Sequence, residues 1–343
     1  CVDTLADLEW IKQEIYHFDK YSTFKLLNLN YLRNRTASIF GEEQLNRILA
    51  PAQTATEMIL HESLLAGGKR LRPLLTVLAY ESFSKEIQSS DSNRLALSIE
   101  CFHKASLIHD DIEDNDQIRY GKETLHARYG VPVAVNVGDL LIGEGYRLLT
   151  ETSFDPETVR NCIKVVAQGH RLLSLGQGEE LLSLQNKQLL SVEKTLEIFK
   201  NKTAAAFKVS LLLGATAGGA DTQTLTQLGF LSENMGIAYQ IKDDLEDFVK
   251  ADKNFEIEKP SIIISFLSDC VKGENKELFE VSFRNNQLEE INKLVMAYNV
   301  KASAEYLLKT YIAKTDDCLR RLDNIGLKLA LHEIMGKTFK DYM

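Results

Sequence analysis

Two acidic clusters carry the residue types and spacing that most clearly predict chemistry. The first, HDDIEDND (residues 109–116), places five carboxylates in seven consecutive residues directly after an apolar segment. Asp110, Asp111 and Asp114 have the spacing D-D-x-x-D, and residues three or four apart share one face of a helix. Carboxylates this close repel unless a cation lies among them or some become protonated. His109 points about 100° away from Asp110, which is typical of a histidine that packs beside a site.

The second cluster, in GIAYQIKDDLEDF (residues 236–248), repeats the spacing with Asp243, Asp244 and Asp247. Gln240 lies on the same helical face, one turn earlier. A single D-D-x-x-D is often a solvated acidic surface, but two on apolar helices seldom arise by chance. Oxygen ligands without cysteines or a convincing histidine set favour Mg²⁺ bound between carboxylates and substrate phosphates.

Basic side chains flank both clusters, as a site for a multiply charged phosphate requires. They lie in the segments GGKRLRP, IRYGK and NKT, where the candidates are Lys69, Arg70, Arg72, Arg119, Lys122, Lys202 and Thr203. Each alone is typical of a solvated surface, so they predict a phosphate site only as a set. No segment has the G-x-x-x-x-G-K-[ST] spacing after a strand, which disfavours a P-loop nucleotide site.

The elements that must position these residues are helices. Only five prolines occur in 343 residues, apolar residues recur at intervals of three and four, and strand-like alternation is hard to find. LLAGGKRLRP predicts a helix that ends near Gly67 and Gly68, with Pro73 early in the next helix. We expect a single all-α domain over residues 1–343, in which residues 1–50 are N-terminal helices without a recognised motif.

Composition excludes several classes of function. The 49 acidic residues outnumber the 40 Lys and Arg, giving a net charge of -9 that disfavours a nucleic-acid surface. The five cysteines are scattered and odd in number, which favours a reducing, cytoplasmic compartment. No apolar run approaches the roughly 18 residues of a membrane-spanning helix, so we expect no transmembrane segment.

Taken in order, these motifs identify a family resemblance. The chain resembles the trans (all-E) isoprenyl diphosphate synthases, or polyprenyl synthetases. The matching segments run from GGKRLRP through ECFHKASLIHDDIED, RYGKETLHARYG, NVGDLL, GQGEEL and NKT to YQIKDDLED. The resemblance implies an isoprenoid-synthase-type helical bundle around a deep central cavity, usually homodimeric. It also implies a prenyltransferase that condenses isopentenyl diphosphate with an allylic diphosphate to make a longer all-trans prenyl diphosphate.

The resemblance further implies roles for individual residues. About three Mg²⁺ and the allylic diphosphate would be bound by Asp110, Asp111, Asp114, Asp243, Asp244 and Asp247. The diphosphate of isopentenyl diphosphate would be bound by Lys69, Arg72 and His103. The allylic diphosphate and the developing cation would be surrounded by Arg119, Lys202, Thr203 and Gln240.

Two positions depart from the family pattern. Tyr120 follows Arg119 where the family usually has a second arginine, and losing a charge-assisted contact costs about 1.5–3 kcal/mol of binding. After Asp247 the usual glycine-lysine loop is missing, and Lys253 and Lys259 are the candidates to replace its lysine.

These departures leave two alternatives open. One is a terpene-synthase-like enzyme, or a prenyltransferase that ionises an allylic diphosphate without elongating it. The other is a non-catalytic subunit of a heteromeric synthase, although six intact aspartates argue against it.

Product length depends on the residues before the first cluster. Ala105, five residues before Asp110, is small where an aromatic residue would shorten a tunnel, and Phe102 is a candidate for the tunnel floor. We therefore expect a product of twenty carbons or more, which Ala105→Phe would shorten.

Overall fold

The computed structural model describes residues 29–250 and 260–343. Lys253 and Lys259 lie outside the described residues, as do residues 1–28. The expected all-α fold is confirmed, with a short hairpin as the one departure in the described part of the chain. The elements are α2 (Leu29–Ile39), α3 (Glu42–Leu49), α4 (Ala55–Leu65), α5 (Leu71–Phe83), α6 (Ser89–Glu113), β1 (Ile118–Arg119), β2 (Lys122–Glu123), α7 (Leu125–Tyr129), α8 (Val131–Thr150), α9 (Pro156–Gln185), α10 (Val192–Phe199), the π-helix η1 (Lys200–Ala204), α11 (Ala205–Ala217), α12 (Thr222–Lys250), α13 (Ile262–Cys270), α14 (Glu274–Arg284), α15 (Leu288–Ala297), α16 (Val300–Arg320) and α17 (Ile325–Thr338).

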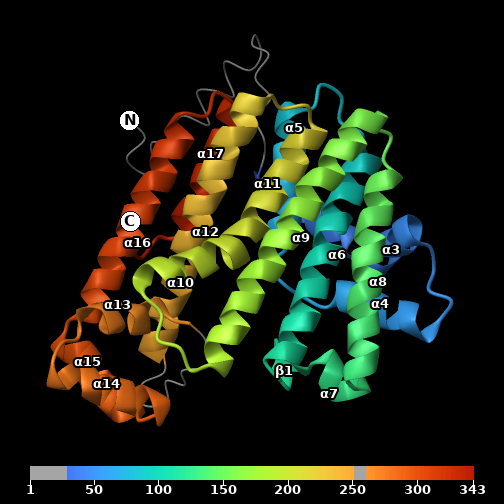
Figure 1. Ribbon diagram of the computed structural model, residues 1–343. Coiled ribbons are helices and arrows are strands. Elements are labelled where there is room, and N and C mark those ends of the chain that lie inside the picture. Colours follow the sequence, from blue (N-terminus) through green and yellow to red (C-terminus); the bar gives the residue numbers. More distant parts are fainter. Residues whose placement is uncertain (1–28, 251–259) are drawn as a thin grey trace.

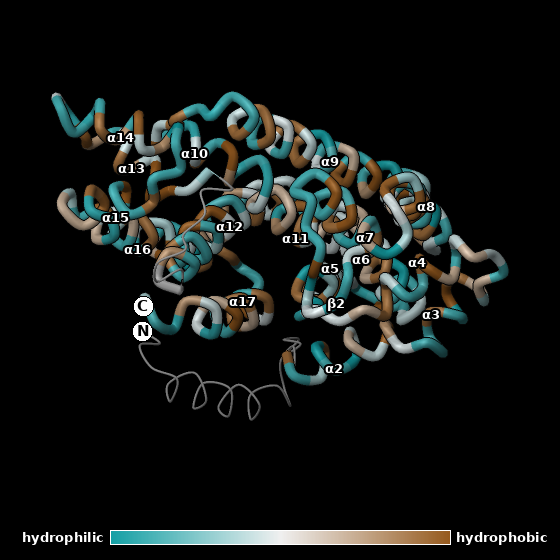
Figure 2. Tube along the Cα trace, turned by 90° about the horizontal axis from the view of Figure 1, so that it is seen from below, coloured by the Kyte–Doolittle hydropathy of each residue, from teal (hydrophilic) through white to brown (hydrophobic). Residues whose placement is uncertain are grey.

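The long helices pack side by side around a central one (Figure 1). Helix α11 packs against α5, α9 and α12, and Figure 2 shows it near the middle of the bundle. Helix α6 packs mainly against α8, and α12 against α16. Buried apolar side chains from Leu29 to Phe339 belong to the larger core cluster, and each large one contributes about 1.5–3 kcal/mol when fully buried.

Local sequence signals set several helix ends. Asp155 caps α9 by accepting hydrogen bonds from the N–H groups of Glu157 and Thr158. Thr54 and Glu57 form a capping box at the start of α4. Helix α4 ends at Leu65 and α5 begins at Leu71, so the predicted helix break in LLAGGKRLRP is confirmed.

None of the helices in residues 29–250 and 260–343 has both the length and the apolar character of a bilayer-spanning segment.

Candidate active site

A cavity of about 880 Å³ opens between α6, α9, α11 and α12, and its two ends differ in chemistry. The polar end is lined by carboxylates of both predicted clusters and by Lys202 and Arg119. The other end is lined mainly by apolar side chains, which include Ile99, Phe102 and Val166. The arrangement can therefore hold a charged head group together with an apolar tail.

The first acidic cluster occupies the last turn of α6 and is partly neutralised by the protein itself. Asp110 lines the cavity, and its Oδ1 lies 4.0 Å from the Nζ of Lys202. Asp111 is buried and forms an ion pair with Nε of Arg119. Burial raises the pKa of Asp111, and the Arg119 guanidinium opposes that rise. Asp114 caps the helix and lines a smaller neighbouring cavity, so only Asp110 of the three lines the main one.

The second cluster lies within α12, and all three of its aspartates line the main cavity. Asp244 accepts hydrogen bonds from the Ile262 N–H at 2.8 Å and from Nε2 of Gln240 at 3.1 Å. Burial raises the pKa of Asp243 to about 6 and the pKa of Asp244 to about 7. Asp244 is thus held by neutral donors, whereas Oδ1 of Asp243 lies 4.0 Å from Nζ of Lys242. A bound cation would offset the cost in solvation of both buried carboxylates.

The donor set fits a hard divalent cation. The carboxylates of α6 and α12 face one cavity, and oxygen is the ligand that Mg²⁺ prefers. The described residues hold no ready-made group of three acidic, histidine or cysteine ligands.

Lys202 and Thr203 lie in η1, a single π-helical turn between α10 and α11. Such a turn bulges out of the helix and is frequent at functional sites. Glycines of two neighbouring helices make room for the bulge. A Cβ at Gly176 of α9 would lie 2.9 Å from the Asn201 carbonyl carbon, and a Cβ at Gly236 of α12 would lie 2.3 Å from the Ala204 Cα. The two glycines therefore allow the bulge to place Lys202 and Thr203 at the cavity.

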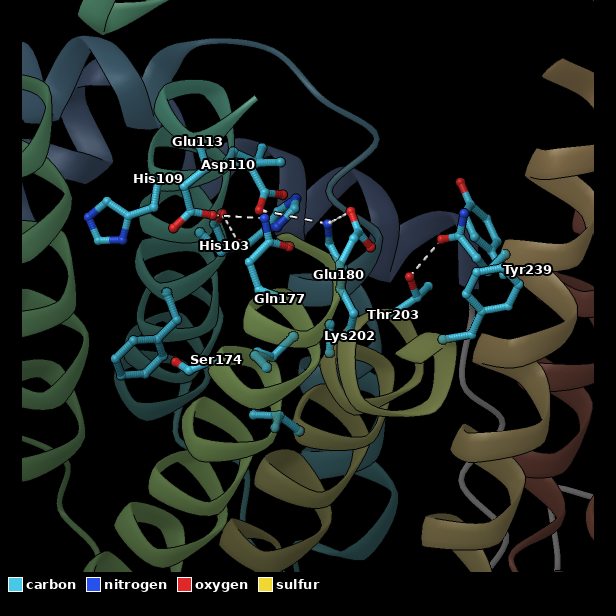
Figure 3. Close-up of a pocket in the computed structure, with 18 of the residues that line it drawn as sticks. His103, His109, Asp110, Glu113, Ser174, Gln177, Glu180, Lys202, Thr203 and Tyr239 are labelled. Carbon is cyan, nitrogen blue, oxygen red and sulfur yellow. Dashed lines mark hydrogen bonds and ion pairs between the residues drawn. The ribbon is translucent and has the colours of Figure 1, made fainter. Parts of the chain in front are cut away.

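Both residues of the bulge have hydrogen-bond partners at the cavity. Nζ of Lys202 lies 2.9 Å from Oε1 of Glu180, and Figure 3 shows these two side chains together with Asp110. Thr203 donates its hydroxyl to Oε1 of Gln240 at 2.7 Å. The structure thus brings the predicted residues Lys202, Thr203 and Gln240 to the same cavity as the two acidic clusters.

Glu180 is a site residue that the sequence reasoning missed. It is 5% exposed and is ion-paired with Lys202 inside the cavity. The signal was available in GQGEEL, because Gln177 and Glu180 are three residues apart and share a helical face.

The predicted basic residues divide into two groups. Arg72 lines the cavity, and its Nη1 lies 3.1 Å from Nε2 of His103. Burial and the Arg72 guanidinium hold the pKa of His103 well below its usual range, so a neutral imidazole accepts a hydrogen bond from Arg72.

Lys69 is exposed and available to a ligand. Arg70 was expected among the phosphate-binding cations, but it is engaged in the interior with Glu100 and with the Leu64 and Ala66 carbonyl groups.

Tyr120 lies at the tip of the β1–β2 hairpin, next to Arg119. Tyr120 and Gly121 both have positive φ, 52° and 76°, as the tight hairpin turn requires. The Tyr120 side chain is 70% exposed, so it adds no cation and no buried hydrogen bond to the cavity.

The apolar end corrects one expectation. Ala105 is buried in the main core cluster, whereas Ser106 and Phe102 of the same helix line the cavity. The Phe102 ring contacts the rings of Tyr146 and His170 edge-on, with centroids 5.0 and 4.6 Å away. Phe102 therefore lines the cavity, whereas Ala105 does not, and the role of Phe102 as a floor stays a prediction.

His109 points away from the Asp110 carboxylate, as Figure 3 shows. Its Nε2 lies 3.8 Å from Oδ1 of Asp139, and a Cβ at Gly138 would lie 2.3 Å from the same nitrogen. His109 itself is among the residues that line the cavity, so its expected role as a histidine packed beside the site stays a prediction.

Comparison with known proteins agrees with this geometry. The family model for polyprenyl synthetase matches residues 53–312, which is most of the chain. The chain belongs to the polyprenyl synthetase family. The recognition from sequence motifs is thus confirmed, and with it the class of enzyme, a transferase of prenyl groups.

Individual relatives support the assignment. The chain is 31% identical over 290 residues to a geranylgeranyl diphosphate synthase of Sulfolobus acidocaldarius, covering 80% of this chain and 85% of the relative. It is 33% identical to a farnesyl diphosphate synthase of Geobacillus stearothermophilus, over 63% and 72% of the two chains. The crystal structure of a geranylgeranyl pyrophosphate synthetase from Pyrococcus horikoshii superposes with a TM-score of 0.77 at 26% identity, over 90% and 97% of the chains.

Proposed function

We propose that this polyprenyl synthetase condenses isopentenyl diphosphate with an allylic diphosphate in a Mg²⁺-dependent reaction that makes a longer all-trans prenyl diphosphate. One observation carries the proposal: a single cavity has carboxylates of two facing helices at one end and an apolar floor at the other. That polarity matches an allylic diphosphate, whose head is multiply charged and whose tail is a hydrocarbon.

Mg²⁺ would be held by the four aspartates that line the cavity, Asp110, Asp243, Asp244 and Asp247, with Asp111 and Asp114 of the first motif beside them, and when bound it would neutralise the departing diphosphate. Lys202 and Arg119 line the same end and add positive charge for the diphosphate. Thr203 donates to Oε1 of Gln240 at the cavity wall, and Gln240 in turn donates to Asp244, so the two side chains are held beside the carboxylates of α12. Arg72, His103 and Lys69 bind the diphosphate of the acceptor. The apolar walls exclude water, which would otherwise capture the allylic cation.

The depth of the cavity supports a product of twenty carbons. Ile99 and Asp110 both line it and are eleven residues apart on α6, which corresponds to about 16 Å at 1.5 Å per residue. An extended isoprene unit adds four carbon–carbon bonds, or about 5 Å. About three units therefore fit below the carboxylates, and a fourth lies at their level beside the diphosphate.

Three further proposals concern domain, assembly and location. A single domain is supported by the larger core cluster, which contains residues from Leu29 to Phe339. A homodimer through α8 and α9 is supported by exposed apolar side chains on these neighbouring helices, such as Val131, Leu175 and Leu182. A cytoplasmic location is supported by the four described cysteines, which are free thiols. Light scattering on the purified chain tests the dimer, and a monomer mass would contradict it.

The activity is tested by measuring diphosphate release from allylic substrates of five to twenty carbons, with and without isopentenyl diphosphate. We expect release that requires both substrates and Mg²⁺. Release that ignores isopentenyl diphosphate would favour the terpene-synthase-like alternative. No release with any substrate would favour a non-catalytic partner subunit.

A further inference from the structure

The loop between α4 and α5 carries Gly67, Gly68 and Lys69 and is held from beneath by a buried lysine. Nζ of Lys104, on α6, donates hydrogen bonds to the Ala66 carbonyl at 3.0 Å and to the Gly67 carbonyl at 3.2 Å. Lys104 is 7% exposed and does not line the main cavity. No role was expected for it from the sequence.

Because Lys104 holds two successive carbonyl groups, peptide geometry also fixes the direction of the N–H groups that follow them. The chain has no cis peptide bonds among its described residues, and in a trans peptide the C=O and N–H groups point in opposite directions. Because the Ala66 and Gly67 carbonyls point at Lys104, the N–H groups of Gly67 and Gly68 point away from it. Neither N–H donates a hydrogen bond to another residue in the described ranges. Successive N–H groups on one side of a turn form a concave site for an anion.

The outer side of the loop is open to a ligand. Gly67 and Gly68 are exposed, and a Cβ built on either residue would have no neighbour within 4 Å. Gly68 has φ +140°, which favours glycine and fixes the direction of the loop. Lys69 follows directly, and its side chain is exposed as well. The two free N–H groups and the Lys69 charge therefore belong to one exposed stretch of three residues.

A second, partly buried cation fixes the other end of the loop. Arg70 donates to the Leu64 carbonyl at 2.6 Å and to the Ala66 carbonyl at 2.8 Å, and it also forms an ion pair with Glu100. The guanidinium lies 4.2 Å from the centre of the Phe40 ring. Arg70 thus anchors the approach to the loop, and Lys104 alone of these two cations contacts the Gly67 carbonyl.

We propose that Lys104 is a positioning residue for the acceptor diphosphate: by holding the Ala66 and Gly67 carbonyls, it turns the Gly67 and Gly68 N–H groups toward the ligand beside Lys69. Its buried charge also adds to the potential at a site where Tyr120 supplies none. The proposal rests on the proposed function, because it names the residue that prepares the acceptor site of the same reaction.

Steady-state kinetics on the full chain with Mg²⁺ test the proposal. Lys104→Met keeps the aliphatic stem and removes the donors and the charge, whereas Lys104→Arg keeps both. We expect Lys104→Met to raise KM for isopentenyl diphosphate about tenfold, which is the scale of one charge-assisted contact. KM for the allylic substrate and kcat should change less than about twofold, and Lys104→Arg should recover most of the loss. Lys276→Met, at an exposed position of α14, is the matched control and should leave all constants unchanged.

A merely structural role predicts a different result, in which Tm falls and both KM values and kcat change together. Gly68→Ala gives an independent reading if Lys104→Met does not fold, because it disturbs the donors without altering the interior. We expect the same selective rise in KM for isopentenyl diphosphate. An unchanged KM in either folded variant would overturn the proposal.

A binding measurement distinguishes a wrong assignment of Lys104 from a wrong proposed function, because binding of isopentenyl diphosphate does not require turnover. A wild-type chain that does not elongate any primer contradicts the proposed function. Calorimetric titration of isopentenyl diphosphate into Mg²⁺-free protein then measures binding at the acceptor site without turnover. A Kd about tenfold weaker for Lys104→Met supports the positioning role, whereas equal affinities or no binding to the wild type contradict it.

Discussion

Helices α6 and α12 carry the same D-D-x-x-D spacing but hold it in different surroundings. On α6, Asp110 lies near Lys202 and Asp111 is paired with Arg119, so protein cations already offset much of the negative charge. On α12, Asp244 is held by the Ile262 N–H and the Gln240 amide, which carry no charge, and burial raises its pKa to about 7. Oδ1 of Asp243 lies 4.0 Å from Nζ of Lys242, so within the second cluster it is Asp244 that depends most on a cation from solution.

The two helices also differ beyond their carboxylates. Below Asp110, α6 continues along the cavity with Ser106, Phe102 and Ile99, and so forms one wall of the apolar end. Below Gln240, α12 turns its small residue Gly236 against the π-helical bulge. The D-D-x-x-D motif thus occurs on two helices with different second roles. Helix α6 also lines the apolar end that would hold the tail, whereas α12 also packs against the bulge that positions Lys202 and Thr203.

The largest expected effect tests what the two helices share. Asp110→Asn and Asp243→Asn should each lower kcat/KM by about 10²–10³-fold, because each removes a carboxylate that faces the reacting diphosphate. Asp317→Asn, at an exposed acidic position of α16, is the control and should have no effect. A loss below about tenfold in either site variant would break the equivalence of the two clusters.

The second prediction concerns the pH dependence of stability, which tests the difference between the two acidic clusters. In Mg²⁺-free buffer the raised pKa of Asp244 means that the folded chain binds its proton more tightly than the unfolded chain does. Its contribution to stability is present below pH 3.8 and is lost as pH rises through about 7. Relative to Asp244→Asn, the wild type should lose about 4 kcal/mol of unfolding free energy between pH 4 and 8. Urea unfolding across this range measures it, and parallel curves for the two proteins would contradict the account.

Product length tests the role that belongs to α6 alone. Phe102→Ala removes a ring from the cavity floor and should extend the product by one or more isoprene units, as measured by mass spectrometry. Ala105→Phe should instead overpack the core at a cost of about 1–3 kcal/mol and leave the product length unchanged. A shorter product from Ala105→Phe would place Ala105 on the tunnel wall after all.

The smallest effect concerns the hairpin that follows α6. Tyr120→Arg restores a cation at an exposed turn and should lower KM for isopentenyl diphosphate by up to about tenfold. Tyr120→Phe keeps the ring without a charge and should change little. Equal constants for the arginine variant and the wild type would indicate that other groups already supply the missing charge.

The sequence predicted the parts of the site whose spacing follows helical periodicity. Asp243, Asp244 and Gln240 lie on one face of α12 and line the cavity as expected. The long helices and the break before Pro73 followed from apolar periodicity and glycine placement. In each case a local pattern was enough, because the relevant geometry is that of a single helix.

The rest depends on contacts between helices, which a local pattern does not contain. Arg70 and Lys69 are neighbours in one basic run, yet only the position of Glu100 on α6 decides that Arg70 turns inward. The π-helical turn at Lys202 depends on glycines of α9 and α12 that are distant in sequence. Ala105 and Ser106 differ in cavity exposure because of the rotation of α6, which the packing of α6 against α8 fixes.

The most direct test of the central claim is mass spectrometry of products formed from ¹³C-labelled isopentenyl diphosphate, an unlabelled allylic diphosphate and Mg²⁺. We predict prenyl diphosphates that carry one labelled unit per added isoprene, accumulate at twenty carbons and disappear when Mg²⁺ is chelated. Unlabelled cyclic or hydroxylated products, formed whether or not isopentenyl diphosphate is present, would contradict the account.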